Sequence, residues 1–119
     1  MSTRILFLVF CIFGLLAGAS CSPQADFDIR GEWAYTMTDS NNNTYDAGTI
    51  VFEGQAAQGS YRETNIYEIE YEGEFSLKRA TLKLTGDETW QGTVTDADTM
   101  TGTWQHADGA NGTFTATRK

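Results

Sequence analysis

The stretch TWQGTVTDADTMTGTW, residues 89–104, contains the pattern that decides the fold. Trp90, Gly92 and Val94 follow one another at steps of two residues, with Gln or Thr at the positions between, and the same spacing returns from Met100 to Trp104. Alternation with a period of two indicates a strand with one buried face. Turn-forming aspartates lie between the two runs. The stretch therefore predicts two antiparallel strands joined by a short hairpin.

A triplet of glycine, then mostly a polar residue, then a large apolar residue recurs along the chain. Its seven copies begin at Gly31, Gly48, Gly59, Gly73, Gly92, Gly102 and Gly112. Successive copies are ten to nineteen residues apart, the length of one short strand and one turn, so each triplet marks one strand of an antiparallel meander. The glycines fall on the apolar face, where a missing side chain lets a strand bend and lets its neighbours approach.

Alternation and turn residues together predict eight strands. Their expected ranges are 29–38, 46–53, 58–63, 66–77, 80–85, 89–95, 99–105 and 111–117. The strand over 66–77 is expected to direct Tyr67, Ile69 and Tyr71 inward. Eight strands joined by short hairpins favour an up-and-down barrel over a sandwich, which needs longer crossovers. We therefore expect an all-β fold, an eight-stranded antiparallel up-and-down meander barrel, over residues 29–119.

The N-terminal region has the order of a secretory signal peptide. Arg4 precedes an apolar run from Ile5 to Leu16 that is too short to span a bilayer, and small residues follow the run. We expect residues 1–20 to be a cleaved signal peptide and residues 21–28 to be a spacer before the barrel domain.

The four residues Gly18-Ala19-Ser20-Cys21 resemble the lipobox of bacterial lipoproteins. The resemblance implies that Cys21 is linked to diacylglycerol, becomes the first residue after cleavage, and is acylated again by a fatty acid such as palmitate. The chain would then be lipid-anchored in the bacterial cell envelope, at the outer membrane if the host has one. Cleavage after Ala19, in an A-x-A pattern, would instead give a secreted protein. Cys11 lies in the discarded segment, so the mature chain forms no internal disulfide.

The chain is acidic, with sixteen Asp and Glu against eight Lys and Arg. Removal of residues 1–20 takes away Arg4 and no acidic residue, which makes the mature chain more acidic still. This charge argues against nucleic acid as a partner and leaves membrane attachment to the lipid. One histidine, His106, and no mature cysteine beyond Cys21 provide neither a usual zinc site nor a nucleophilic set. We expect no enzyme activity, no cofactor, no metal ion, and a monomer.

Gly31-Glu32-Trp33 opens the first expected strand, and Arg118 follows the last one. These residues resemble the strand-opening motif and the partner arginine of the calycin group, which comprises lipocalins, fatty-acid-binding proteins and avidins. The resemblance implies that Trp33 closes one end of the barrel beneath the Arg118 guanidinium. The chain is more similar to the small lipocalin-like lipoproteins of bacteria than to full-length lipocalins. Binding of a small apolar or amphipathic molecule is the function that the resemblance implies.

Seven residues are candidates for contact with such a ligand. They are Tyr35, Tyr61, Tyr67, Tyr71, Trp90, Trp104 and His106. The alternative is that these side chains fill the interior, because an eight-stranded barrel is only just wide enough for its own side chains. A filled barrel would indicate a structural envelope lipoprotein or a non-catalytic interaction module, such as a hydrolase inhibitor. Such a module would use the loop from Asp39 to Asp46 or the acidic row Glu68, Glu70, Glu72 and Glu74.

Overall fold

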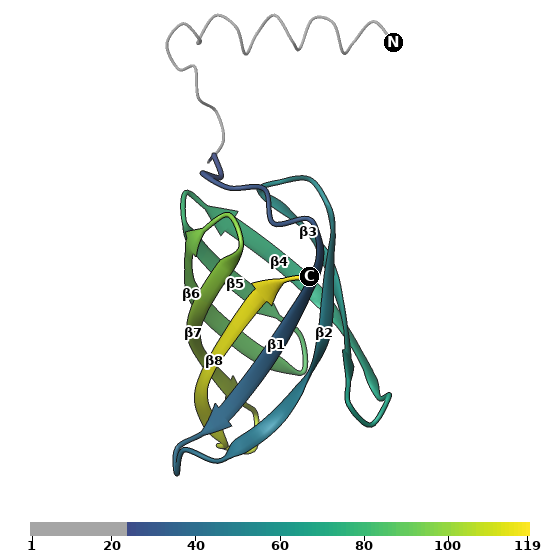
Figure 1. Ribbon diagram of the computed structural model, residues 1–119, viewed down its shortest axis with the longest axis vertical. Coiled ribbons are helices and arrows are strands. Elements are labelled where there is room, and N and C mark those ends of the chain that lie inside the picture. The colour runs from purple at the N-terminus through teal and green to yellow at the C-terminus, as the bar shows by residue number, and fades with distance from the viewer. Residues whose placement is uncertain (1–23) are drawn as a thin grey trace, which may run out of the picture.

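A computed structural model describes residues 24–119 and shows a closed barrel of eight antiparallel strands (Figure 1). The strands are β1 (Gly31–Asp39), β2 (Thr44–Gly54), β3 (Gln58–Asn65), β4 (Glu70–Lys78), β5 (Thr81–Thr85), β6 (Glu88–Asp96), β7 (Thr99–His106) and β8 (Asn111–Arg118). Each strand pairs with the next one in sequence, and β8 pairs with β1. The predicted all-β meander barrel is confirmed.

The β6–β7 hairpin shows why the quoted stretch specifies this fold. Trp90 pairs with Trp104 and Gly92 with Gly102, so the two tryptophans lie on the same inner face. A Cβ atom on Gly102 would lie 2.4 Å from the Gly92 Cα and 2.2 Å from the Gln91 carbonyl oxygen. The two strands can approach this closely only because both positions lack a side chain.

The interior is a single apolar core formed by the inward positions of all eight strands. Its buried members are Ile29, Trp33, Tyr35, Met37, Ile50, Phe52, Tyr61, Phe75, Leu77, Leu82, Leu84, Trp90, Val94, Met100, Trp104, Phe114 and Ala116. Threonines and charged residues fill most of the alternate, outward positions. Burial of this one face is the main stabilising contribution, because apolar area leaves water as the barrel closes.

The segment before β1 covers one end of the barrel, which we call the closed end; it is the upper end in Figure 1. Arg79 in the β4–β5 turn donates its backbone N–H to the Gln24 carbonyl and accepts a hydrogen bond from the Asp26 N–H. Ile29 is fully buried, and the Trp33 indole N–H donates to its carbonyl at 2.8 Å. The N-terminal segment is thereby fixed across the closed end.

Arg118 completes the closed end. Its guanidinium carbon lies 4.5 Å from the centroid of the Trp33 ring, a cation–π arrangement. The same guanidinium donates to the carbonyls of Asp28 at 2.7 Å, Arg30 at 3.0 Å and Ala97 at 3.1 Å. One side chain therefore links the N-terminal segment, the β6–β7 turn and β8.

The strand expected over 66–77 is wrong in its first four residues. The chain turns between Asn65 and Glu70, and Glu68 adopts a φ of 63°, which an extended strand does not allow. The Asn65 side-chain oxygen accepts the backbone N–H groups of Tyr67 and Ile69, which ends β3 and shapes the turn. Tyr67 and Ile69 are 74% and 49% exposed instead of facing inward, and Ile66 beside them is 62% exposed.

The expected signal peptide and Cys21 lie outside the described residues. Within residues 24–119 no helix is both long and apolar enough to cross a membrane.

Candidate functional site

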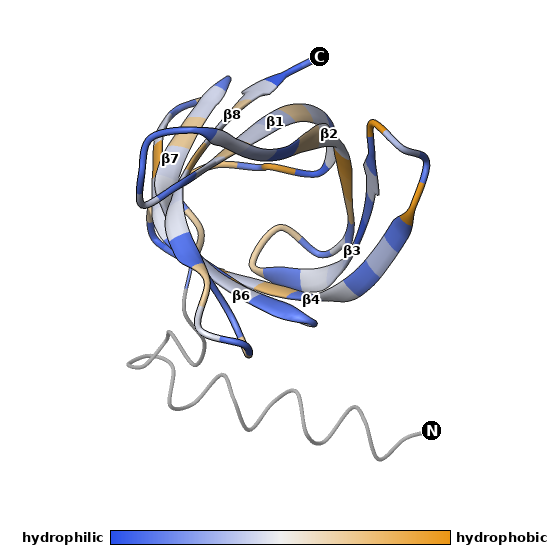
Figure 2. Cartoon of the chain, turned by 90° about the horizontal axis from the view of Figure 1, so that it is seen from below, coloured by the Kyte–Doolittle hydropathy of each residue, from blue (hydrophilic) through white to orange (hydrophobic). Residues whose placement is uncertain are grey.

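The barrel end opposite the closed end, the open end, is formed where the β1–β2, β3–β4, β5–β6 and β7–β8 hairpins turn. Figure 2 looks onto this end. Toward this end, several strands carry ionisable residues at their inward positions. We call five of them the open-end cluster: Tyr35 on β1, Asp46 on β2, Glu63 on β3, Tyr71 on β4 and Glu88 on β6.

Glu63 is the most deeply buried charged group of the cluster. The residue is 2% exposed, and the Tyr35 hydroxyl donates a hydrogen bond of 2.6 Å to its Oε2 atom. Burial raises the pKa of Glu63 to about 7, and the carboxylates of Glu88 and Asp46 add to this rise, while the bond from Tyr35 opposes it. Near neutral pH this carboxyl group is thus divided between its neutral and charged forms.

Asp46 and Glu88 place two further carboxylates at the same end. The Asn65 amide donates to Asp46 Oδ2 at 3.4 Å, and the Trp90 indole N–H donates to Glu88 Oε1 at 3.3 Å. Burial also raises the pKa of Glu88. The pKa of Tyr71 is raised, first by burial and then by the negative charges of Asp46, Glu63 and Glu88.

Aromatic rings surround these carboxylates. Tyr35 meets Trp90 edge to face, with ring centroids 5.5 Å apart. Tyr45 stacks on Trp104 with centroids 4.3 Å apart. Met37 pairs with Asp46 and the next residue pairs with Thr44, so Tyr45 is the extra residue of a β-bulge. A bulge re-aims a side chain, and this one lets Tyr45 cover a ring of the interior.

The structure separates the seven predicted ligand-contact residues. Tyr35, Tyr61, Trp90 and Trp104 are buried in the interior, and Tyr71 and His106 are half-buried at the open end. His106 lies opposite Glu88 in the β6–β7 ladder, and its Nδ1 atom is 3.1 Å from an Asp108 carboxylate oxygen. Tyr67 lies on the exposed β3–β4 turn, so the expectation that it faces inward is wrong.

Sequence reasoning missed Asp46, Glu63, Glu88 and Tyr45. The expected strand 58–63 ends at Glu63, and the alternation that directs Tyr61 inward also directs Glu63 inward. A charged residue at an inward position was the available signal. The sequence contains no comparable signal for Tyr45, because a β-bulge depends on how two strands pair and not on a local pattern.

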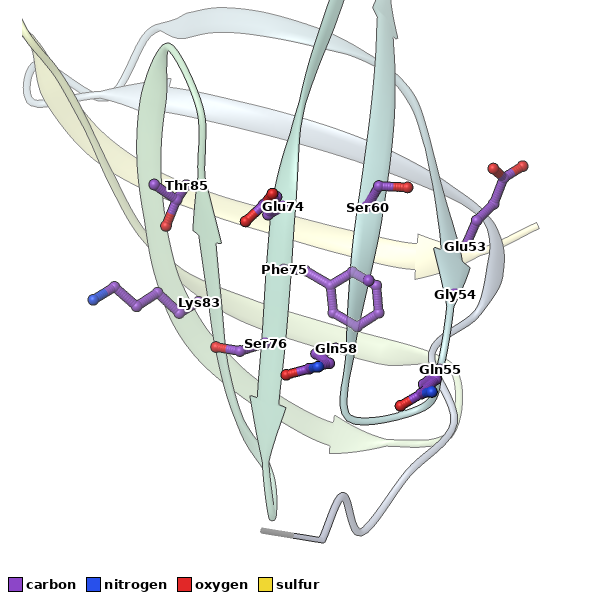
Figure 3. Close-up of a pocket in the computed structure, with 11 residues that line it drawn as sticks. Glu53, Gly54, Gln55, Gln58, Ser60, Glu74, Phe75, Ser76, Lys83 and Thr85 are labelled. Carbon is purple, nitrogen blue, oxygen red and sulfur yellow. The ribbon is translucent and has the colours of Figure 1, made fainter. Parts of the chain in front are cut away.

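A separate hollow of about 670 Å³ lies on the outer wall over β3, β4 and β5 (Figure 3). Its polar lining includes Gln55, Gln58, Ser60, Ser76 and Thr85. Glu53 and Lys83 extend at its opposite margins and do not converge on a common point (Figure 3). The hollow shares no residue with the open-end cluster. Among the residues 24–119, no group of three or more His, Cys, Asp or Glu could hold a metal ion.

Comparison with known proteins supports the fold. No protein-family model and no curated protein matches the sequence. Solved structures do match, among them a redesigned β-barrel, b11L5F_LGL, with a TM-score of 0.66 and 18% identity over 82% of this chain and 99% of that one. A redesigned barrel bound to DFHBI, mFAP1, has a TM-score of 0.58 and 20% identity over 76% of this chain and 94% of that one. At these identities the likeness concerns the fold alone. Fold and site together define a small closed β-barrel with an acidic, tyrosine-lined open end.

Proposed function

We propose that this chain is a non-catalytic lipoprotein of the bacterial cell envelope whose barrel binds a small apolar or amphipathic molecule at the open end. The observation that carries the proposal is the position of Glu63. The residue is 2% exposed, and its carboxylate accepts a hydrogen bond from Tyr35, whose ring packs against Trp90. A few oriented polar groups in an apolar and aromatic wall are what a small-molecule site requires.

Packing of the barrel interior alone does not explain why position 63 holds a glutamate. Burial of a carboxyl group with one hydrogen bond costs several kcal/mol more than burial of an apolar side chain of similar size. A leucine at position 63 would close the interior at lower cost. The presence of a carboxyl group at this position is explained if it orients a bound molecule. That mFAP1, a barrel of the same fold, is bound to DFHBI supports the capacity of such a barrel to hold a small molecule.

The proposed anchor fits the orientation of the barrel. Gln24 lies at the closed end, hydrogen-bonded to the β4–β5 turn, only three residues after Cys21. A lipid on Cys21 would therefore hold the closed end toward the membrane. The open end would face away from the bilayer and would be free to take up a ligand from the aqueous phase.

A protein-interaction module is the second candidate, and the β3–β4 hairpin favours it. Figure 2 shows this hairpin standing away from the ring of strands with apolar residues at its tip. Ile66, Tyr67 and Ile69 are the exposed apolar residues of that tip. If the chain acts on a partner protein, this hairpin is a better contact than the loop from Asp39 to Asp46, because three large apolar side chains are exposed together there.

Native mass spectrometry of the mature protein, purified from its own envelope fraction, tests the proposal. We expect the mass of a diacylated or triacylated Cys21 and a further non-covalent small molecule. Glu63→Leu should lose that molecule, whereas Glu74→Leu, on the outer wall of β4, should retain it. A barrel free of small molecules would favour the interaction module, and an unmodified Cys21 would contradict the anchor.

A further inference from the structure

We propose that the molecule bound at the open end is an organic cation, a protonated amine on an aromatic or apolar body. This inference rests on the proposed function and names the class of its ligand. It is carried by the distribution of charge along the barrel, by the free oxygen of Glu63 and by the aromatic rings around it.

The positive side chains are placed away from the open end. The segments that form it, residues 39–49, 63–72, 85–91 and 103–112, contain no Lys or Arg. Arg79 and Arg118 lie at the closed end, where Arg118 and Lys119 approach Asp98 and Glu32 at 3.4 Å. Among residues 24–119, no ion pair involves the inward carboxylates Asp46, Glu63 or Glu88. Arg62, which pairs with Glu72 in the ladder, lies on the exposed outer face of β3. Charge of one sign gathered at one end of the barrel attracts ligands of the opposite sign.

Glu63 gives this charge a specific point of contact. Within residues 24–119 its carboxylate makes one hydrogen bond, the bond that Oε2 accepts from Tyr35. Every fully enclosed side-chain nitrogen or oxygen of this region has a hydrogen-bond partner. The Oε1 atom of Glu63 has no hydrogen-bond partner in this region and is therefore not fully enclosed, so a water-sized group can reach it. An ammonium N–H placed there would make a charge-assisted hydrogen bond to a carboxylate that is already oriented.

The aromatic residues fit the rest of such a ligand. Tyr35 donates to Glu63 and packs against Trp90, and Tyr61 is buried on the same face of β3 as Glu63. The stacked pair Tyr45 and Trp104 lies at the open end. Aromatic faces attract organic cations and pack against apolar groups. A metal ion would instead require several convergent oxygen ligands, and an anion would meet like charges from Asp46, Glu63 and Glu88. The surroundings thus favour an organic ammonium group over both.

A charge series on one molecular body tests the inference. The probes are 2-(1-naphthyl)ethylamine, 2-(1-naphthyl)ethanol and 1-naphthylacetate, titrated into the mature domain by calorimetry at pH 7.5. We expect the amine to bind about tenfold more tightly than the alcohol, as one charge-assisted hydrogen bond allows, and the acid to bind most weakly. Glu63→Gln should reduce amine affinity about tenfold and leave alcohol affinity unchanged. Glu74→Gln, a matched change on the outer wall, should alter neither.

The outcomes distinguish this inference from the proposed function. Equal affinity for amine and alcohol, or preference for the acid, would overturn the cationic ligand while small-molecule binding stands. Binding of none of the three probes would overturn both. Because the series is measured first on the unaltered protein, the result does not depend on whether Glu63→Gln folds. If that variant fails to fold, Glu88→Gln provides the second test, with the same loss expected only for the amine.

Discussion

The hydroxyl of Tyr35 on β1 lies 2.6 Å from a carboxylate oxygen of Glu63 on β3, and the two residues are 28 positions apart in sequence. The bond crosses the inner face of β2 and links two strands that are not neighbours in the sheet. It places a titratable group against the apolar core, where its ionisation affects stability.

The first prediction concerns stability and pH. The pKa of Glu63 is about 7 in the folded barrel and near 4.5 in an unfolded chain, so between these pH values the folded state holds the proton more firmly. The contribution of Glu63 to stability is therefore fully present below pH 4.5 and is lost as pH rises to 7, by up to a few kcal/mol. Denaturant unfolding at several pH values measures this change.

Glu63→Gln isolates the contribution, because glutamine keeps an acceptor for Tyr35 and does not ionise. We expect the variant to be more stable than the natural protein at pH 8 and to differ little at pH 4.5. Glu74→Gln, exposed on β4, should show no such difference. The prediction fails if the stability difference between natural protein and Glu63→Gln is independent of pH.

The second prediction concerns the closed end. Arg118→Ala removes the cation–π contact with Trp33 and three hydrogen bonds to backbone carbonyls. We expect a loss of about 2–3 kcal/mol in the free energy of unfolding. Arg118→Lys should recover only a part, because an ammonium group cannot reproduce the planar fork. Lys119→Ala, a change at the exposed neighbouring residue, should lower the free energy of unfolding by less than about 1 kcal/mol. An equal loss of stability in Arg118→Ala and Lys119→Ala would refute a special role for Arg118.

The third prediction concerns close approach of β6 and β7. Gly102→Ala would place a Cβ atom 2.2 Å from the Gln91 carbonyl oxygen, and backbone atoms cannot move aside without breaking the ladder. We expect a loss of about 3 kcal/mol or more, or failure to fold. Gly109→Ala is the matched comparison: Gly109 has a φ of 102° but no atom within 4 Å of the added methyl group. Backbone strain alone should cost it about 1–2 kcal/mol. Thermal unfolding followed by circular dichroism compares the two.

These glycines also explain how much of the fold was predictable. Strand number, order and inward faces follow from alternation and from glycines such as Gly92 and Gly102, which are local features of sequence. The turn at residues 66–69 was not predictable in this way, because Tyr67, Ile69 and Tyr71 continue the alternation of β3 without a change of phase. What ends the strand is the Asn65 side chain bound to two backbone N–H groups, and alternation does not report such a bond.

The candidate site was only half predictable for a related reason. Tyr35, Tyr61 and Trp90 were identifiable as inward aromatic residues from their own strands. The role of Glu63 depends on its hydrogen bond with Tyr35, which lies two strands away in the sheet. It also depends on Asp46 of β2 and Glu88 of β6, whose charges raise the pKa of Glu63. Barrel closure brings these groups together, and a local pattern contains no information on which inward residues meet.

The fourth prediction connects the titration of Glu63 with binding of a cation. A bound ammonium group stabilises the charged carboxylate, so binding of 2-(1-naphthyl)ethylamine should release about half a proton at pH 7 and its affinity should rise about tenfold from pH 6 to pH 8. The alcohol should show neither effect. Calorimetry in two buffers of different ionisation enthalpy measures the released proton.

The groups that face Glu63 determine the controls. Tyr35, Asp46, Tyr61, Tyr71, Asp87 and Glu88 influence it or are influenced by it, and His106 lies opposite Glu88. His106 needs a control variant of its own. Glu63→Gln should therefore abolish most of the pH dependence of amine binding, whereas His106→Gln should preserve it. If His106→Gln abolished the pH dependence and Glu63→Gln preserved it, the dependence would be assigned to His106. The reason is that amine affinity stops depending on pH only when the group that exchanges the proton is removed.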